Sequence, residues 1–327
     1  MPDSPEQTRI DALAARIAAG RSQEVVRAYR DAPDGWMSVT IEARILVAGA
    51  AARTGDYRLA TELADASREL LEQGDDDHTL FRALNILGGV AFERGRLETA
   101  WGWYDRAHRV AGRLDDPALL AKVTNNMASI RHRTGDATEA ALLYRRALAW
   151  YAAAGDPRGG AETRHNLSIV DRAAGRLDDA LAHASEACAL AERVGDPGLI
   201  GLTLAGLTAA RLALGTLDSA EPIARSRELA LEAGDAVGAV ETDRLQAEWH
   251  LRQRRFAKAV AAAEAARSGA RALGAVITLR DCDETAAAAW ESAGNRMLAG
   301  ARRDEARLLA QLLAPPDLDG GAPVRPS

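Results

Sequence analysis

The stretch NMASIRHRTGDATEAALLYRRALAWYAAAGD, residues 126–156, decides the fold because its skeleton recurs along the chain. Its first mark is a glycine followed five residues later by a small alanine, Gly135 and Ala140. Successive glycines from Gly55 to Gly215 are 40 residues apart. The other copies of the pair are Gly55/Ala60, Gly95/Ala100, Gly175/Ala180, Gly215/Ala220 and Gly294/Ala299, with imperfect copies at Arg254/Ala259 and Gly20/Val25.

A second mark lies between the first ones, so each period holds two segments and two turns. The segments run about 17 residues and are rich in Ala, Leu, Arg and Glu, which favour helix. Val123, Met127 and Ile130 share one helical face. The glycine of the first mark is typical of a helix end, and Asp or Asp-Pro in the second mark starts the next helix. The second marks are Gly74-Asp75, Asp115-Asp116-Pro117, Gly155-Asp156-Pro157, Gly195-Asp196-Pro197 and Gly234-Asp235.

A helix pair of this size cannot bury its apolar face alone, so each pair must stack on its neighbours to complete the core. The periodicity therefore predicts an all-α solenoid of tandem antiparallel helix pairs, with sixteen helices in eight pairs and no strand.

The pattern resembles the tetratricopeptide repeat over roughly residues 5–313. The period of 40 residues exceeds the usual 34 or so and is similar to the longer-helix variety in kinesin light chains, Rap-type receptors and MalT-like regulators. The resemblance implies a right-handed α-solenoid. It is carried by Asn126-Met127-Ala128 and Asn166-Leu167-Ser168 before the glycine, with Ile86-Leu87-Gly88 lacking the asparagine, and by Tyr104, Tyr144, Ala107, Ala147 and Ala187 at the family's aromatic and small positions.

The organisation follows from the repeats. We expect an N-terminal capping helix pair at 1–35, a solenoid of seven helix pairs at 36–313 and a disordered tail at 314–327, where Pro and Gly are dense. The formal charge of −6 argues against general nucleic-acid binding. The N-terminus lacks the apolar core of a signal peptide, and Cys188 and Cys282 form no disulfide framework. These features favour a reduced, cytoplasmic compartment, with no membrane association.

Signatures of catalysis are absent from the sequence. It contains no Walker-type loop, no Gly-x-Ser-x-Gly elbow and no His-Glu-x-x-His helix. The six histidines are scattered singly, without the spacing that would place two on one helical face for a metal ion. We therefore expect a non-enzymatic protein with no catalytic residues, no metal site and no cofactor.

The first helices of the pairs should line the concave side, and their exposed positions change character along the chain. They are polar in the second to fourth full pairs, with Glu93 and Glu162 as acidic exceptions, and apolar in the fifth. Amides can bind an extended backbone, cations can hold carboxylates, and an apolar end can take an anchor. An ordinary solvated helix face would look similar. The expected groove residues are Arg82, Asn85, Lys122, Asn125, Ser129, His132, Arg133, His165, Arg172, Leu202 and Leu212.

These features favour a scaffold, adaptor or regulator that binds a peptide or protein segment, acidic and with an apolar anchor. The alternative is a small-ligand-sensing regulator of the MalT-like kind acting through a partner, and an enzyme with an unrecognised site is a third possibility. The oligomeric state is open.

Two further patterns lie outside the groove. Arg131, Asp171 and Arg211 occupy equivalent positions in successive pairs and predict a ladder of alternating charge between stacked helices. Trp101 and Trp103 cannot both be buried easily on one helix, so they are a second candidate contact surface.

Overall fold

The computed structural model describes residues 5–31 and 40–313, and these ranges contain sixteen α-helices and no strand. Consecutive helices pack against each other as pairs, which confirms the predicted all-α solenoid. The expected tail at 314–327 lies outside the described residues, and the proposed domain division stays a prediction. The helices are α1 (Pro5–Ala18), α2 (Ser22–Asp31), α3 (Ile41–Arg53), α4 (Tyr57–Leu71), α5 (Asp77–Glu93), α6 (Leu97–Leu114), α7 (Pro117–Arg133), α8 (Ala137–Ala154), α9 (Pro157–Ala173), α10 (Leu177–Val194), α11 (Pro197–Leu214), α12 (Glu221–Glu232), α13 (Ala236–Arg252), α14 (Phe256–Leu273), α15 (Val276–Ser292) and α16 (Arg296–Leu313).

The turns behave as the repeat predicts. Gly135 has a left-handed φ of 87°, and Asp136 then caps α8 by accepting a hydrogen bond from the backbone N–H of Glu139 at 3.0 Å. Glycine supplies this conformation without steric cost, and the Asp side chain satisfies one of the free N–H groups at the helix start. Arg254 adopts the same conformation with a φ of 56°, although it carries a side chain.

The repeated alanines mark where helices approach most closely. Their side chains are fully buried, because a larger residue would push the helices apart. Gly88 has a similar role, since a Cβ atom there would lie 2.5 Å from Cε1 of Tyr104. The fully buried alanines of the repeat are Ala60, Ala100, Ala140, Ala180, Ala259 and Ala299.

One copy of the repeat departs from the rest. α12 begins at Glu221, six residues after Gly215, whereas α10 begins two residues after Gly175. Pro222 explains the delay, because proline has no N–H to donate and is tolerated only in the first turn of a helix. Ala220 therefore caps α12 instead of packing inside it.

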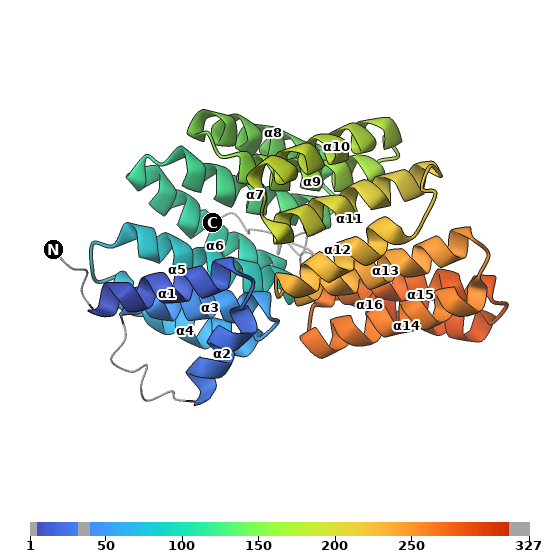
Figure 1. Cartoon of the computed structure of the whole chain (residues 1–327), viewed down its shortest axis with the longest axis horizontal. Coiled ribbons are helices and arrows are strands. Elements are labelled where there is room, and N and C mark those ends of the chain that lie inside the picture. Colours follow the sequence, from blue (N-terminus) through green and yellow to red (C-terminus); the bar gives the residue numbers. More distant parts are fainter. Residues whose placement is uncertain (1–4, 32–39, 314–327) are drawn as a thin grey trace, which may run out of the picture.

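The solenoid closes on itself. Figure 1 shows the chain rising from α1–α5 through α7–α10 and returning through α13–α16 beside the N-terminal helices. A Cβ atom on Gly20 would overlap the carbonyl oxygen of Glu232, and one on Gly55 would lie 2.6 Å from Leu273. Gly95 lies against Leu313 in the same way, and α5 contacts α15. We call the line along which α1–α7 meet the C-terminal helices α12–α16 the seam; the contacts of Gly20, Gly55 and Gly95 lie in it.

The predicted charge ladder is wrong. Asp171 accepts a hydrogen bond from Nε of Arg176 at 2.9 Å, within its own turn. The guanidinium of Arg131 lies 4.2 Å from the ring centroid of Trp101, and Arg211 is exposed. Stacking on an indole keeps a half-buried guanidinium close to a favourable partner without a carboxylate.

Among the described helices, α11 is the one long and apolar enough to span a membrane by length and composition. It packs between neighbours of the solenoid, in contact with α9, α10, α12 and α13.

Candidate functional site

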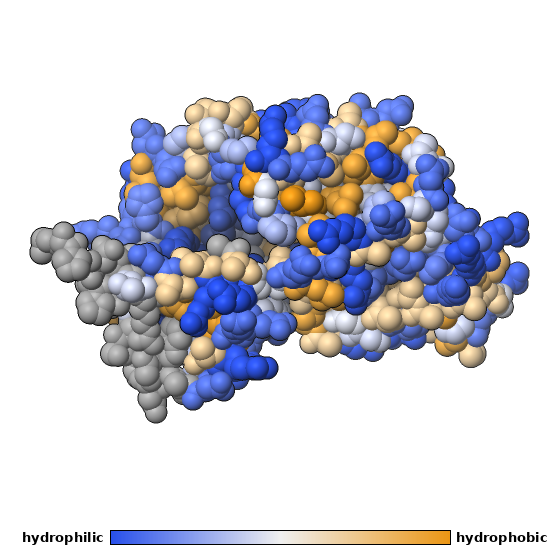
Figure 2. Space-filling model, in the orientation of Figure 1, coloured by the Kyte–Doolittle hydropathy of each residue, from blue (hydrophilic) through white to orange (hydrophobic). Residues whose placement is uncertain are grey.

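Three cavities lie along the inner surface of the closed solenoid, lined mainly by the first helix of each pair. The first, of about 550 Å³, lies among α3, α5 and α7. The second, of about 290 Å³, lies among α9, α11 and α13, and the third, of about 430 Å³, among α7, α9, α13 and α15. Glu93 lines the first two and Arg172 the last two, so the cavities are adjoining. We call them together the central channel; Figure 2 shows one face of the molecule, hollowed between the N-terminal helices and those above them.

Most of the residues expected in the groove line this channel. Asn125 and Leu212 do not: Asn125 is only 7% exposed, and Leu212 packs in a core cluster with Leu245 and Trp249. Ligand binding by the others stays a prediction. The channel-lining residues are Arg82, Asn85, Lys122 and Ser129 in the first cavity, His165 and Leu202 in the second, His132 and Arg133 in the third, and Arg172 in both the second and the third.

The asparagines bond to one another across stacked helices. Asn126 on α7 donates to the side-chain oxygen of Asn85 on α5 at 2.8 Å, and Asn166 on α9 donates to that of Asn125 on α7 at 3.1 Å. These bonds fix the register of three successive inner helices. Some of the asparagine donors and acceptors that the sequence suggested for a ligand backbone are therefore already hydrogen-bonded within the fold.

Three arginines of the channel, Arg82, Arg133 and Arg244, form ion pairs. Nη1 of Arg82 lies 3.3 Å from Glu42, and Nη1 of Arg133 donates to Asp281 across the seam at 2.8 Å. Lys122 and Arg172 have no ion pair with any carboxylate of the described chain. Lys122 is exposed in the first cavity, whereas Arg172 is half-buried and burial lowers its pKa.

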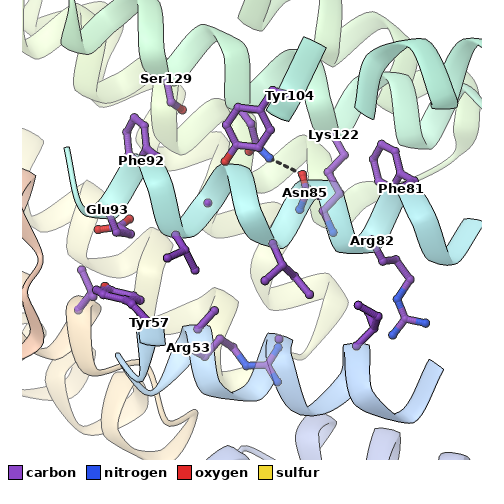
Figure 3. Close-up of a pocket in the computed structure, with 18 of the residues that line it drawn as sticks. Arg53, Tyr57, Phe81, Arg82, Asn85, Phe92, Glu93, Tyr104, Lys122 and Ser129 are labelled. Atoms are coloured by element: carbon purple, nitrogen blue, oxygen red, sulfur yellow. Dashed lines mark hydrogen bonds between the residues drawn. The ribbon is translucent and has the colours of Figure 1, made fainter. Parts of the chain in front are cut away.

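Burial also shifts the acids and histidines of the channel. It raises the pKa of Glu93 to about 7, although the nearby Arg133 opposes the shift. It lowers the pKa of His132 and of His165 to about 4, helped by Arg133 and Arg172 respectively. At neutral pH both imidazoles are uncharged and Glu93 is near the midpoint of its titration. Figure 3 shows Glu93 and Tyr57 at one end of the first cavity and Arg82 at the other.

Two channel residues cannot be predicted from the repeat. Asp235 lines the first and second cavities beside Glu93, and Asp281 meets Arg133. Both come from pairs far along the chain, and only closure of the solenoid brings them there. The repeat pattern shows which side of a helix faces inward but carries no signal for contacts between distant pairs.

The described part of the chain contains no cluster of three or more His, Cys, Asp or Glu side chains that could hold a metal ion. The shifted acids and histidines are spread over different walls of the channel.

Comparisons with known proteins agree with this fold. The tetratricopeptide repeat model matches residues 119–193. No curated protein sequence matches the chain. The Rap conjugation gene regulator of plasmid pLS20, solved with the Phr* peptide, is similar with a TM-score of 0.68 and 13% identity, over 84% of this chain and 77% of that one.

Two further solved structures are similar. Aspartyl phosphate phosphatase F from Bacillus subtilis has a TM-score of 0.63 and 14% identity, over 88% of this chain and 73% of that one. A Rap protein complexed with competence and sporulation factor has a TM-score of 0.60 and 11% identity, over 94% of this chain and 96% of that one. At such low sequence identity, the similarity to these structures concerns the fold alone. With the matched repeat and these neighbours, the chain is a helical-repeat protein of the tetratricopeptide type.

Proposed function

We propose that this protein is a non-catalytic interaction scaffold or regulator that binds a peptide or an extended protein segment in its central channel. The observation that carries the proposal is the chain of three adjoining cavities, with unpaired cations on successive inner helices. An elongated row of cavities suits an extended ligand, which can place side chains in each, better than a compact one.

The charges favour an acidic ligand. Lys122 on α7 and Arg172 on α9 line cavity walls and have no ion pair with the described chain. Arg53 on α3 has no ion pair there either, but it donates hydrogen bonds to the Ser22 hydroxyl. A half-buried guanidinium without a carboxylate is costly, so an anionic ligand group beside Arg172 would relieve that cost. Glu93 opposes anions least when it is protonated, and its pKa near 7 keeps it partly neutral.

The second cavity can hold an apolar anchor. Leu202, Ala205 and Ala209 form one wall, and small residues at Gly201 and Gly206 let α11 approach its neighbours closely. A volume of about 290 Å³ is at the lower limit of small-molecule pockets and is suited to a single large side chain. Leu202 is therefore the proposed contact for the anchor, and the buried Leu212 packs in a core cluster with Ala209 and Leu245 of the cavity lining.

The similar Rap structures support a peptide, because two were solved with the Phr* peptide and with competence and sporulation factor. A small-ligand sensor is the second candidate, since the first cavity, at about 550 Å³, lies within the size range of small-molecule sites. The two candidates differ in how much of the channel the ligand needs.

Binding to an arrayed library of short peptides tests the proposal. We expect acidic peptides with one large apolar residue to be enriched, and Lys122→Glu to weaken their binding about 10-fold, or roughly 1.4 kcal/mol. Raising the ionic strength should weaken it further. Lys258→Glu is the matched control, because Lys258 is also exposed but lies on the outer helix α14. Equal losses from both variants, or no enriched peptide, would count against a peptide in the channel.

A further inference from the structure

The end of α16 lies at the edge of the central channel. Leu313, its last residue, packs against Gly95, where a Cβ atom would lie 2.5 Å from Cδ2 of the leucine. Gly95 is two residues beyond Glu93, which lines the first and second cavities. Any residue that follows Leu313 therefore starts within a short distance of the channel.

The sequence that follows has the chemistry proposed for the ligand. Residues 314–327 read APPDLDGGAPVRPS, in which Leu318 stands between Asp317 and Asp319. This is an apolar residue flanked by carboxylates. The second cavity offers the complement, an apolar wall at Leu202 beside the unpaired guanidinium of Arg172.

The length of the segment is sufficient. An extended chain spans at most about 3.3–3.6 Å per residue, so Leu318 can lie up to roughly 17 Å from Leu313 and Asp319 up to roughly 20 Å. Glu93, close to the start of the segment, shares the second cavity with Arg172. Proline at positions 315 and 316 restricts the unbound chain and lowers the entropy lost on binding.

We propose that residues 314–327 are an intramolecular ligand of the central channel, with Leu318 in the second cavity and a flanking aspartate on Arg172. The inference rests on the proposed function, because it takes the same channel as a peptide site. A tethered segment has an effective concentration on the order of 1 mM, so an intrinsic Kd of about 0.1 mM suffices to occupy the site most of the time. An external ligand must then displace the segment, and its apparent affinity falls about 10-fold.

The test uses the full chain and a labelled peptide of sequence APPDLDGGAPVRPS added in solution. In a vacated variant, Asp317→Ser, Leu318→Ser and Asp319→Ser remove the motif from the chain's own segment. We expect the labelled peptide to bind this variant with a Kd of about 0.1 mM, by fluorescence anisotropy, and to bind the wild type about 10-fold more weakly. A matched control, Val324→Ser with Arg325→Ser, changes the same segment away from the motif and should behave as the wild type.

Two further measurements locate the contact. A labelled peptide with Leu318→Ser should bind the vacated variant at least 10-fold more weakly, and this change leaves the protein untouched. Arg172→Gln in the vacated variant should weaken the unmodified peptide by a similar factor, after circular dichroism has shown equal helix content. Equal binding to wild type and vacated variant, or no binding to either, would overturn the proposal.

The peptide library separates this inference from the proposed function. If library peptides bind the vacated variant through Lys122 but the segment peptide does not, the segment is no ligand and the channel remains a peptide site. If neither binds, both proposals fail.

Discussion

Glycines of one repeat position have two different environments in this protein. Gly20, Gly55 and Gly95 lie in the seam, against atoms of α12, α14 and α16, whereas a Cβ atom on Gly135 or Gly175 would meet nothing within 4 Å. The backbone is nevertheless the same, with φ of 75° at Gly20 and 74° at Gly175. Turn conformation is thus a local property of the repeat, while the contact that closes the solenoid belongs to the whole chain.

The seam also determines the electrostatics of the channel. It brings Asp281 to Arg133, and it places Asp235 near Glu93. The middle of the solenoid, from α7 to α11, keeps its free turns and contributes the unpaired Lys122 and Arg172. Closure therefore neutralises one part of the inner surface and leaves another available to an anion.

The largest effect should come from adding one methyl group at the seam. Gly20→Ala and Gly175→Ala both force an L-residue into the left-handed region, which costs about 1–2 kcal/mol. Gly20→Ala must also move the backbone of Glu232, which a rigid helix end resists, so we expect a further loss of about 2 kcal/mol. Urea unfolding measures the difference, and small-angle scattering should show a less compact Gly20→Ala variant. Equal losses at the two positions would mean that the seam contributes no stability.

Glu93 should make the closed form less stable as the pH rises. Its carboxyl pKa is about 7 in the folded chain against an ordinary value of 4.5, because burial disfavours the charge. Below pH 4.5 both the folded and the unfolded state hold the proton, and between pH 4.5 and 7 only the folded state does. The free energy of unfolding therefore falls over this window by about 3 kcal/mol and then stays level.

Glu93→Gln should remove this fall, so that the variant gains on the wild type from pH 4.5 to 7. Glu98→Gln, at an exposed position on α6, is the control and should follow the wild type. Thermal unfolding at several pH values gives the comparison. If the stability of wild type and of Glu93→Gln depends on pH in the same way, Glu93 is solvated. That end of the channel would then be open to water.

The ion pair across the seam should give a smaller effect. Arg133 and Asp281 are both mostly buried and 2.8 Å apart, so we expect a coupling free energy of about 1.5 kcal/mol in a cycle of Arg133→Gln and Asp281→Asn. The exposed pair of Arg58 and Glu62 within α4, at 3.2 Å, should give about 0.5 kcal/mol or less. If the two cycles give the same coupling, the seam pair is no better desolvated than a surface pair.

This contrast explains what could be predicted from the sequence. Helices, turns and the inward face of each first helix follow from residues close in sequence, and Lys122 and Arg172 were found that way. Asn125 and Leu212 were misplaced because a polar or apolar residue at a given helical position can equally face a neighbouring helix. Asp281 could not be predicted as a channel residue, because its partner Arg133 is 148 positions away and meets it only after closure.

The smallest expected effect concerns Arg254, which stands where the other repeats have the glycine of the first mark. Arg254 has a φ of 56° and donates its backbone N–H to Leu251 O at 2.9 Å, so helix packing imposes the left-handed turn on a residue that disfavours it. Arg254→Gly should relieve about 1–2 kcal/mol of strain and lose somewhat less through the greater freedom of glycine in the unfolded chain, a net gain of about 0.5 kcal/mol. Arg254→Ala keeps the Cβ atom and should gain nothing, which separates the backbone effect from loss of the exposed side chain. A gain in stability of the same size in both variants would show that the guanidinium of Arg254, and not its left-handed backbone, is destabilising. The turn would then share the backbone conformation of the glycine-bearing turns without backbone strain.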